Sequence, residues 1–107
     1  MSRDVMEEIK NEITQNKIVV YMKGTKEMPR CGFSAATIEI LSRFGVEYKD
    51  VNILEDPEKW SAIKQFSDWP TIPQVYIGGE FVGGCDIVRE MDAKGELEPL
   101  VQKALAG

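Results

Sequence analysis

Histidine is absent from this 107-residue sequence, and cysteine occurs only at Cys31 and Cys85. Two cysteines are too few for a disulfide scaffold, and no C-x-x-C motif is present because Ser34 occupies its fourth position. Without histidine, the chain cannot perform Cys–His nucleophilic catalysis and cannot build most zinc sites, which need several Cys or His ligands. A metal site would therefore need ligands from outside one chain.

Long apolar runs and a positive net charge are also lacking. No apolar run approaches membrane-spanning length, and the net charge of −5 argues against nucleic acid as the main partner. The N-terminus, Met1-Ser2-Arg3-Asp4, has no apolar signal core and is not Arg- and Ser-rich like a transit peptide. We therefore expect one globular domain over residues 1–107, either cytoplasmic or the mature form of an organellar protein.

The most informative stretch is KGTKEMPRCGFS, from Lys23 to Ser34. It lies between an apolar run at 18–22, typical of a buried strand, and a helical pattern over 32–44 that Gly45 should end. Cys31 thus lies at a helix N-terminus, where unpaired N–H groups and the helix dipole favour a thiolate. The alternative is that Cys31 is a small buried apolar residue, as free cysteines usually are.

Positive charge is unevenly distributed toward this cysteine. Lys17, Lys23, Lys26 and Arg30 precede Cys31, so a small anionic ligand is one interpretation. A solvated surface of mixed charge is the other.

Seven further elements follow from local patterns. The capping box that begins at Asp4 predicts a helix over 4–15 with Met6, Ile9 and Ile13 on its buried face. The remaining predictions are a strand over 46–53, a helix from Asp56-Pro57 to near Ser67, two strands around Gly78-Gly79, and helices near 86–94 and 97–105. This order predicts the α/β class and a thioredoxin-like fold, with a four-stranded mixed sheet flanked by helices.

Three motifs together carry a family resemblance. CGFS at 31–34, WPTIPQVY at 69–76 and GGCD at 83–86 resemble the monothiol, CGFS-type glutaredoxins. KGT at 23–25 and Asp56-Pro57 match as well, so the resemblance covers about residues 5–105.

The resemblance implies a glutathione site. It places the γ-glutamyl end at Cys85 and Asp86, the middle of the tripeptide along Ile72 and the glycine carboxylate near Lys23, and it implies a cis peptide before Pro73. A trans proline and an N-cap role for Asp86 are the plainer alternatives. The implied glutathione-binding residues are Lys23, Cys31, Phe33, Thr71, Ile72, Pro73, Cys85 and Asp86.

One position departs from the family pattern. Members commonly carry an arginine in the third helix that helps to hold the glycine carboxylate, and Trp60 stands at the matching position. An indole N–H is one neutral donor and cannot replace a bidentate guanidinium. Lys59 or Lys64 could compensate, glutathione could bind more weakly, or Trp60 could simply belong to the core.

The resemblance also implies the function. Cys31 would be the catalytic residue and the iron ligand in a [2Fe–2S] cluster bridged between two protomers and two glutathiones, and the cluster would be delivered to apo iron–sulfur proteins. A BolA-like protein could replace one protomer. The alternative is a glutathione-dependent reductase of protein–glutathione mixed disulfides, for which Ser34 removes the resolving thiol. Cys85 could resolve instead, and the long loop Gly24–Arg30 belongs to the class that the family associates with poor reductase activity.

Overall fold

Four strands form one mixed sheet in the computed structural model, which describes residues 3–107. The central strands are β1 (Ile18–Met22) and β3 (Gln74–Ile77), and the edge strands are β2 (Lys49–Asn52) and β4 (Glu80–Gly83). β2 runs parallel to β1, while the β1–β3 and β3–β4 pairs are antiparallel. This confirms the predicted thioredoxin-like sheet. Met1 and Ser2, which belong to the N-terminal stretch without a signal core, lie outside the described range.

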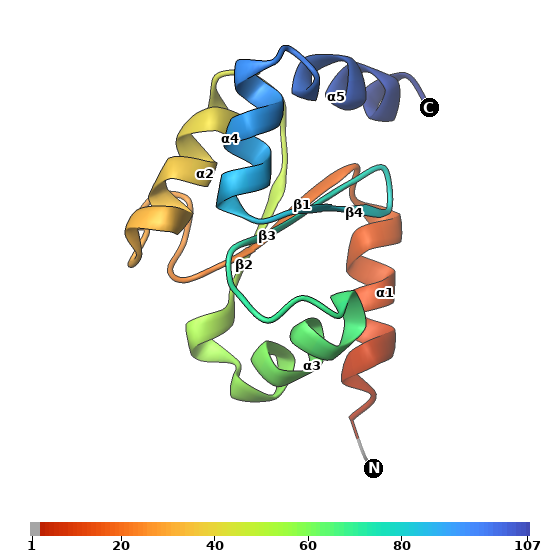
Figure 1. The fold of residues 1–107 in the computed structure, drawn as a ribbon. Helices are drawn as coiled ribbons and strands as arrows, with labels where there is room; N and C mark the ends of the chain where they lie inside the picture. Colours follow the sequence, from red (N-terminus) through yellow and green to blue (C-terminus); the bar gives the residue numbers. More distant parts are fainter. Residues whose placement is uncertain (1–2) are drawn as a thin grey trace.

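Helices cover both faces of the sheet (Figure 1). One face packs against α1 and α3, and the other packs against α2, α4 and α5. None of the helices within residues 3–107 is long and apolar enough to span a bilayer. The helices are α1 (Val5–Gln15), α2 (Gly32–Ser42), α3 (Pro57–Ser67), α4 (Cys85–Ala93) and α5 (Leu97–Ala106), with a short 3₁₀ helix, η1 (Ile53–Glu55), after β2.

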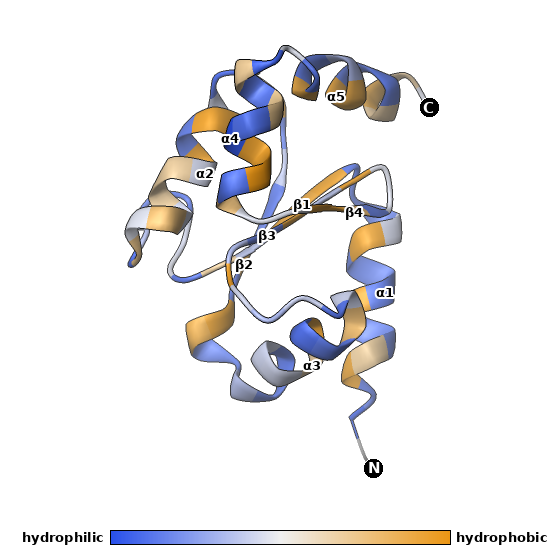
Figure 2. Ribbon diagram, viewed as in Figure 1, coloured by the Kyte–Doolittle hydropathy of each residue, from blue (hydrophilic) through white to orange (hydrophobic). Residues whose placement is uncertain are grey.

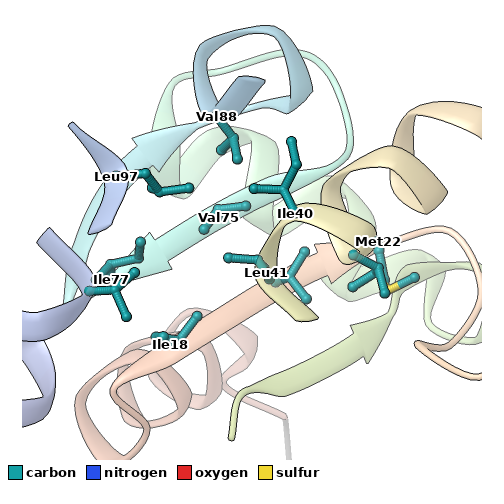
Figure 3. Packing of buried hydrophobic residues seen from close by; sticks show 11 residues of the cluster. Ile18, Met22, Ile40, Leu41, Val75, Ile77, Val88 and Leu97 are labelled. Carbon is teal, nitrogen blue, oxygen red and sulfur yellow. The ribbon is translucent and has the colours of Figure 1, made fainter. Parts of the chain in front are cut away.

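The central strands are largely apolar on both faces, and helices cover both of these faces. In β1, Ile18 and Met22 pack under α2, α4 and α5 (Figure 3), whereas Val19 and Tyr21 face α1 and α3. All five residues of β1 are buried. Much of β1 is coloured hydrophobic in Figure 2, which agrees with this double burial and is typical of sheets with helices on both sides.

The strand predicted over 46–53 is shorter than expected. β2 covers Lys49–Asn52 because its partner, β1, offers pairing positions only from Val19 to Met22. The apolar residues of this stretch do not all lie at alternate positions, because they pack on two different faces of the sheet. Val46 and Tyr48 pack toward α2 and its neighbours, while Val51 packs toward α1 and α3.

Two helix predictions need correction. α2 ends at Ser42 rather than residue 44, because the next backbone N–H groups turn to i−3 carbonyls and Gly45 then adopts a left-handed φ of +66°. Met6 is 40% exposed and not on the buried face of α1. Val5, Ile9 and Ile13, which are spaced by four, form the row that packs on the sheet.

Candidate functional site

Cys31 is the N-cap residue of α2, and its side chain is partly exposed. The pKa of its thiol is lowered, most of all by a hydrogen bond from the backbone N–H of Ser34. Burial opposes this and is the second-largest effect, while the N–H of Phe33, the charge of Lys23 and the hydroxyl of Ser34 each lower the pKa by smaller amounts. The helix terminus therefore stabilises the thiolate, as the sequence predicted.

Ser34 has a role that sequence reasoning missed. Its side chain is fully buried, and its Oγ accepts a hydrogen bond from the backbone N–H of Lys23 at 3.1 Å. The same hydroxyl also lowers the pKa of the Cys31 thiol. Ser34 thus ties the end of β1 to the thiol, in addition to removing the second cysteine of a dithiol motif.

The four cations that precede Cys31 in the sequence do not all line the cavity beside it. Lys17 donates from Nζ to the carbonyl oxygens of Leu105 and Gly107, and Lys26 lies over the ring of Tyr48 at 4.8 Å. Lys23 is the one member of the four that lines the cavity beside Cys31. Proximity in the sequence therefore does not bring Lys17 and Lys26 to the site.

That loop, Gly24–Arg30, is closed by its own backbone. The N–H groups of Thr25 and Met28 each donate to the other residue's carbonyl, and Arg30 N–H donates to Lys23 O at 2.8 Å. Gly24 has a φ of +94°, and a Cβ there would lie 2.5 Å from the carbonyl oxygen of Met28, so only glycine fits. The Asn52 side chain accepts from Gly24 N–H and fixes the loop to the end of β2.

A cavity of about 440 Å³ opens beside Cys31, and all eight residues predicted to bind glutathione line it. They come from the end of β1, the start of α2, the loop before β3 and the start of α4. The structure therefore brings the predicted residues together in one place. Six further residues line the same cavity: Trp60, Lys64, Trp69, Pro70, Gly84 and Ile87.

The loop before β3 is held from beneath by Gln74. This side chain is fully buried, and its Nε2 donates to the carbonyl oxygens of Trp69 and Thr71. The Ile72–Pro73 peptide bond is cis, as the resemblance implied. Within residues 3–107, the backbone N–H and C=O of Ile72 form no hydrogen bond to a protein group. An extended ligand could pair with them.

The β4–α4 junction approaches this loop closely. A Cβ on Gly84 would lie 3.2 Å from the carbonyl oxygen of Pro73, so glycine permits the contact. Gly84, not Asp86, is the N-cap of α4, and no side chain caps that helix. Asp86 instead lies exposed in the first turn, where its carboxylate and the nearby free N–H groups of α4 border the cavity.

Trp60 and Lys64 occupy the far side of the cavity from α4. Lys59 is not available there, because its buried ammonium pairs with Glu12 at 2.6 Å on the α1 side. Trp60 is half-buried and lines the cavity, so it is not plain core. The helical spacing of Trp60 and Lys64, one turn apart on α3, was the sequence signal that both share one face.

Sequence reasoning also missed Trp69. Its indole N–H is buried and has no hydrogen-bond partner in the described part of the chain. Its place at the start of the WPTIPQVY motif was the available signal.

Comparisons with known proteins agree with this site. The glutaredoxin family model matches residues 18–82. The chain is 55% identical over 94 residues to a probable monothiol glutaredoxin 2 of Rickettsia typhi, covering 88% of this chain and 85% of the relative. It is 46% identical to the mitochondrial monothiol glutaredoxin-5 of Saccharomyces cerevisiae over 99% of this chain and 73% of the relative.

A solved structure shows the same fold. The holo form of glutaredoxin C1 from Populus tremula x tremuloides superposes with a TM-score of 0.86 at 31% identity, covering 96% of this chain and 91% of that chain. The family match, the relatives and the fold agree with the motifs around Cys31. The chain belongs to the glutaredoxin family, and its similar relatives are monothiol members.

Proposed function

We propose that this protein binds glutathione and uses Cys31 to carry a [2Fe–2S] cluster, bridged between two protomers, for delivery to apo-proteins. The observation that carries the proposal is a single, stabilised thiolate at the edge of a cavity lined by a cation, a carboxylate and an unpaired backbone amide. A single glutaredoxin domain over residues 1–107, in the cytoplasm or in an organelle, is part of the same proposal. The mitochondrial relative is consistent with an organellar location.

The charges that line the cavity complement those of glutathione. It is an extended tripeptide with two carboxylates and one ammonium group. Lys23 offers a cation at one end of the cavity, while Asp86 and the free N–H groups of α4 offer a carboxylate and anion-binding donors at the other. Ile72 lies between them with an unpaired backbone amide, and Thr71, Pro73, Phe33 and Cys85 complete the walls.

The donor set fits a shared cluster better than an internal one. A [2Fe–2S] cluster takes four ligands, usually thiolates. Within residues 3–107, no three His, Cys, Asp or Glu side chains lie close enough together to hold a metal ion, and Cys85 is buried. Cys31 would supply one thiolate, and a second protomer and two glutathione thiolates would supply the others.

The second candidate is reduction of protein–glutathione mixed disulfides. The Cys31 thiolate would attack the glutathione sulfur, releasing the protein thiol and forming a Cys31–glutathione disulfide. A second glutathione thiolate would then regenerate Cys31 and leave glutathione disulfide. The stabilised thiolate supports this chemistry too, so a disulfide-exchange assay must accompany any test of cluster binding.

The decisive experiment is anaerobic reconstitution with ferrous iron, sulfide and glutathione, followed by the visible absorption spectrum. We expect cluster absorption in the wild type, its loss in Cys31→Ser because a serine oxygen is a poor iron ligand, and its retention in Cys85→Ser. Equal loss in both variants would show that Cys85 ligates iron or that the site is built differently. A colourless wild type with rapid disulfide exchange would favour the reductase.

A further inference from the structure

Two lysines share one aromatic ring at the end of the cavity. The ammonium of Lys23 lies 5.4 Å from the centroid of the Trp60 ring, and that of Lys64 lies 5.8 Å from it. Both distances are within the range of a cation–π interaction, and tryptophan is the best aromatic partner for one. All three side chains line the cavity that also contains Cys31.

Neither ammonium is committed to a carboxylate of the protein. In the described range, the lysines that form ion pairs are Lys59 and Lys94, and neither Lys23 nor Lys64 is among them. Their charges are therefore available to an anionic group that enters the cavity. On a protein with a net charge of −5, such a local pair of cations is a specific feature and not a reflection of overall charge.

Lysine alone is a poor substitute for arginine at such a site. Its ammonium sits on a flexible four-carbon stem, and holding that stem in one position costs conformational entropy when a ligand binds. A ring that already attracts the ammonium restrains the stem beforehand, so less entropy is lost on binding. The negative face of the indole also reduces the repulsion between two neighbouring cations.

We propose that Trp60 is a positioning residue that orders Lys23 and Lys64 into a paired-ammonium site for the C-terminal carboxylate of the ligand. This inference rests on the proposed binding of glutathione. It assigns to Trp60 an indirect role, because the indole acts through the two lysines and does not itself bind the carboxylate. Lys64 supplies the second positive charge, and Lys59 is excluded by its pairing with Glu12.

The test is a cycle of protein and ligand variants, measured by amide NMR titration under reducing conditions. The ligands are glutathione and glutathione whose glycine carboxylate is converted to an amide. The wild type should bind glutathione more tightly than the amide. Trp60→Leu should weaken glutathione binding about fivefold and leave amide binding nearly unchanged, as expected for losing two weak cation–π contacts.

Two further variants separate positioning from packing. Trp60→Phe keeps an aromatic face and should restore most of the discrimination between acid and amide. Lys64→Gln leaves the ring in place and should reduce that discrimination, because Lys23 then remains as the one cation. The prediction therefore does not depend on whether Trp60→Leu folds well.

Each remaining outcome overturns a defined claim. Equal weakening of both ligands in Trp60→Leu would show that Trp60 serves only the shape of the cavity. Equal binding of acid and amide by the wild type would overturn the paired-ammonium site while leaving the glutathione proposal intact. A wild type that binds neither ligand would overturn the glutathione proposal itself, together with this inference.

Discussion

At the scale of single residues, the chemistry depends on the small number of groups that lower the pKa of the Cys31 thiol. The backbone N–H of Ser34 has the largest effect on the pKa of Cys31, and Lys23 adds a smaller one. No substitution other than proline removes a backbone N–H. The protein therefore keeps part of its thiol activation even when neighbouring side chains change.

This division of causes gives a pH-dependent prediction. We expect Lys23→Ala to raise the Cys31 pKa, Lys23→Arg to change it less, and Ser34→Ala to raise it by removing the hydroxyl donor. All three should stay below the pKa of a free cysteine. The rate of iodoacetamide alkylation against pH measures this, in a Cys85→Ser background that leaves one thiol.

The lowered pKa of Cys31 fixes the direction in which the alkylation profile should shift with pH. A lowered pKa keeps the thiolate at lower pH, so alkylation by the wild type should decline only as pH falls through that lowered value, and each variant should decline at higher pH. Lys103→Ala, which removes a cation from α5, should behave like the wild type. A Lys23→Ala profile that matches the wild type would leave the helix terminus and Ser34 as the activators.

The residues of the site were largely predictable, but their supports were not. The eight positions expected from the motifs all line one cavity. Gln74, which holds the loop before β3, gave no signal, because a buried glutamine looks like any polar strand residue until its hydrogen bonds are seen. The four cations before Cys31 were a misleading signal, because spacing in the sequence does not determine where each side chain lies in the fold. Only Lys23 of the four lines the cavity.

At the scale of elements, α3 is the helix whose position matters most to the ligand, because it carries Trp60 and Lys64. Asp56 is its N-cap and accepts from Lys59 N–H at 3.1 Å. The same carboxylate pairs with Arg3, which precedes α1, at 2.7 Å. These interactions hold the pKa of Asp56 at about 2, with the Arg3 hydrogen bonds as the main cause.

Two substitutions separate the cap from the ion pair. Asp56→Ala should lower the free energy of unfolding by about 1 kcal/mol through loss of the cap, whereas Asp56→Asn keeps a capping oxygen and should cost less. Because the folded pKa is depressed, the advantage of wild type over Asp56→Asn should be complete above about pH 4 and disappear as pH falls through about 2. Urea unfolding across this range measures it. An advantage that does not change with pH would exclude the ion pair as its source.

The elements themselves were predicted well wherever a local chemical signal marks an end. Asp4 and Asp56 begin their helices as the capping patterns indicated, and Gly78-Gly79 forms the hairpin turn. The predicted boundaries were wrong where the length of a strand depends on the strand that pairs with it. β2 is short because β1 is short, and no residue in the predicted strand announces that limit.

At the scale of the whole molecule, the surface offers little apolar area for a permanent partner. Within residues 3–107, the markedly exposed large apolar side chains are Met6, Met28, Leu54 and Phe33, and only Phe33 lines the cavity beside Cys31. Stable protein interfaces usually bury about 1,600 Å² in total and have an apolar centre. Four scattered side chains do not provide one, so the proposed dimer needs another source of free energy.

Our last prediction is that the cluster itself supplies that free energy. If ligands from two chains and two glutathiones share one cluster, its binding free energy is also the free energy of dimerisation. The apo protein should then elute from a sizing column as a monomer, and the visible absorbance should appear only in a dimer peak. Adding a chelator or omitting glutathione should convert the dimer to monomer, while Cys85→Ser should still form it. A coloured monomer would contradict the shared cluster, and a dimer that survives removal of iron and glutathione would place the driving force in the protein surface.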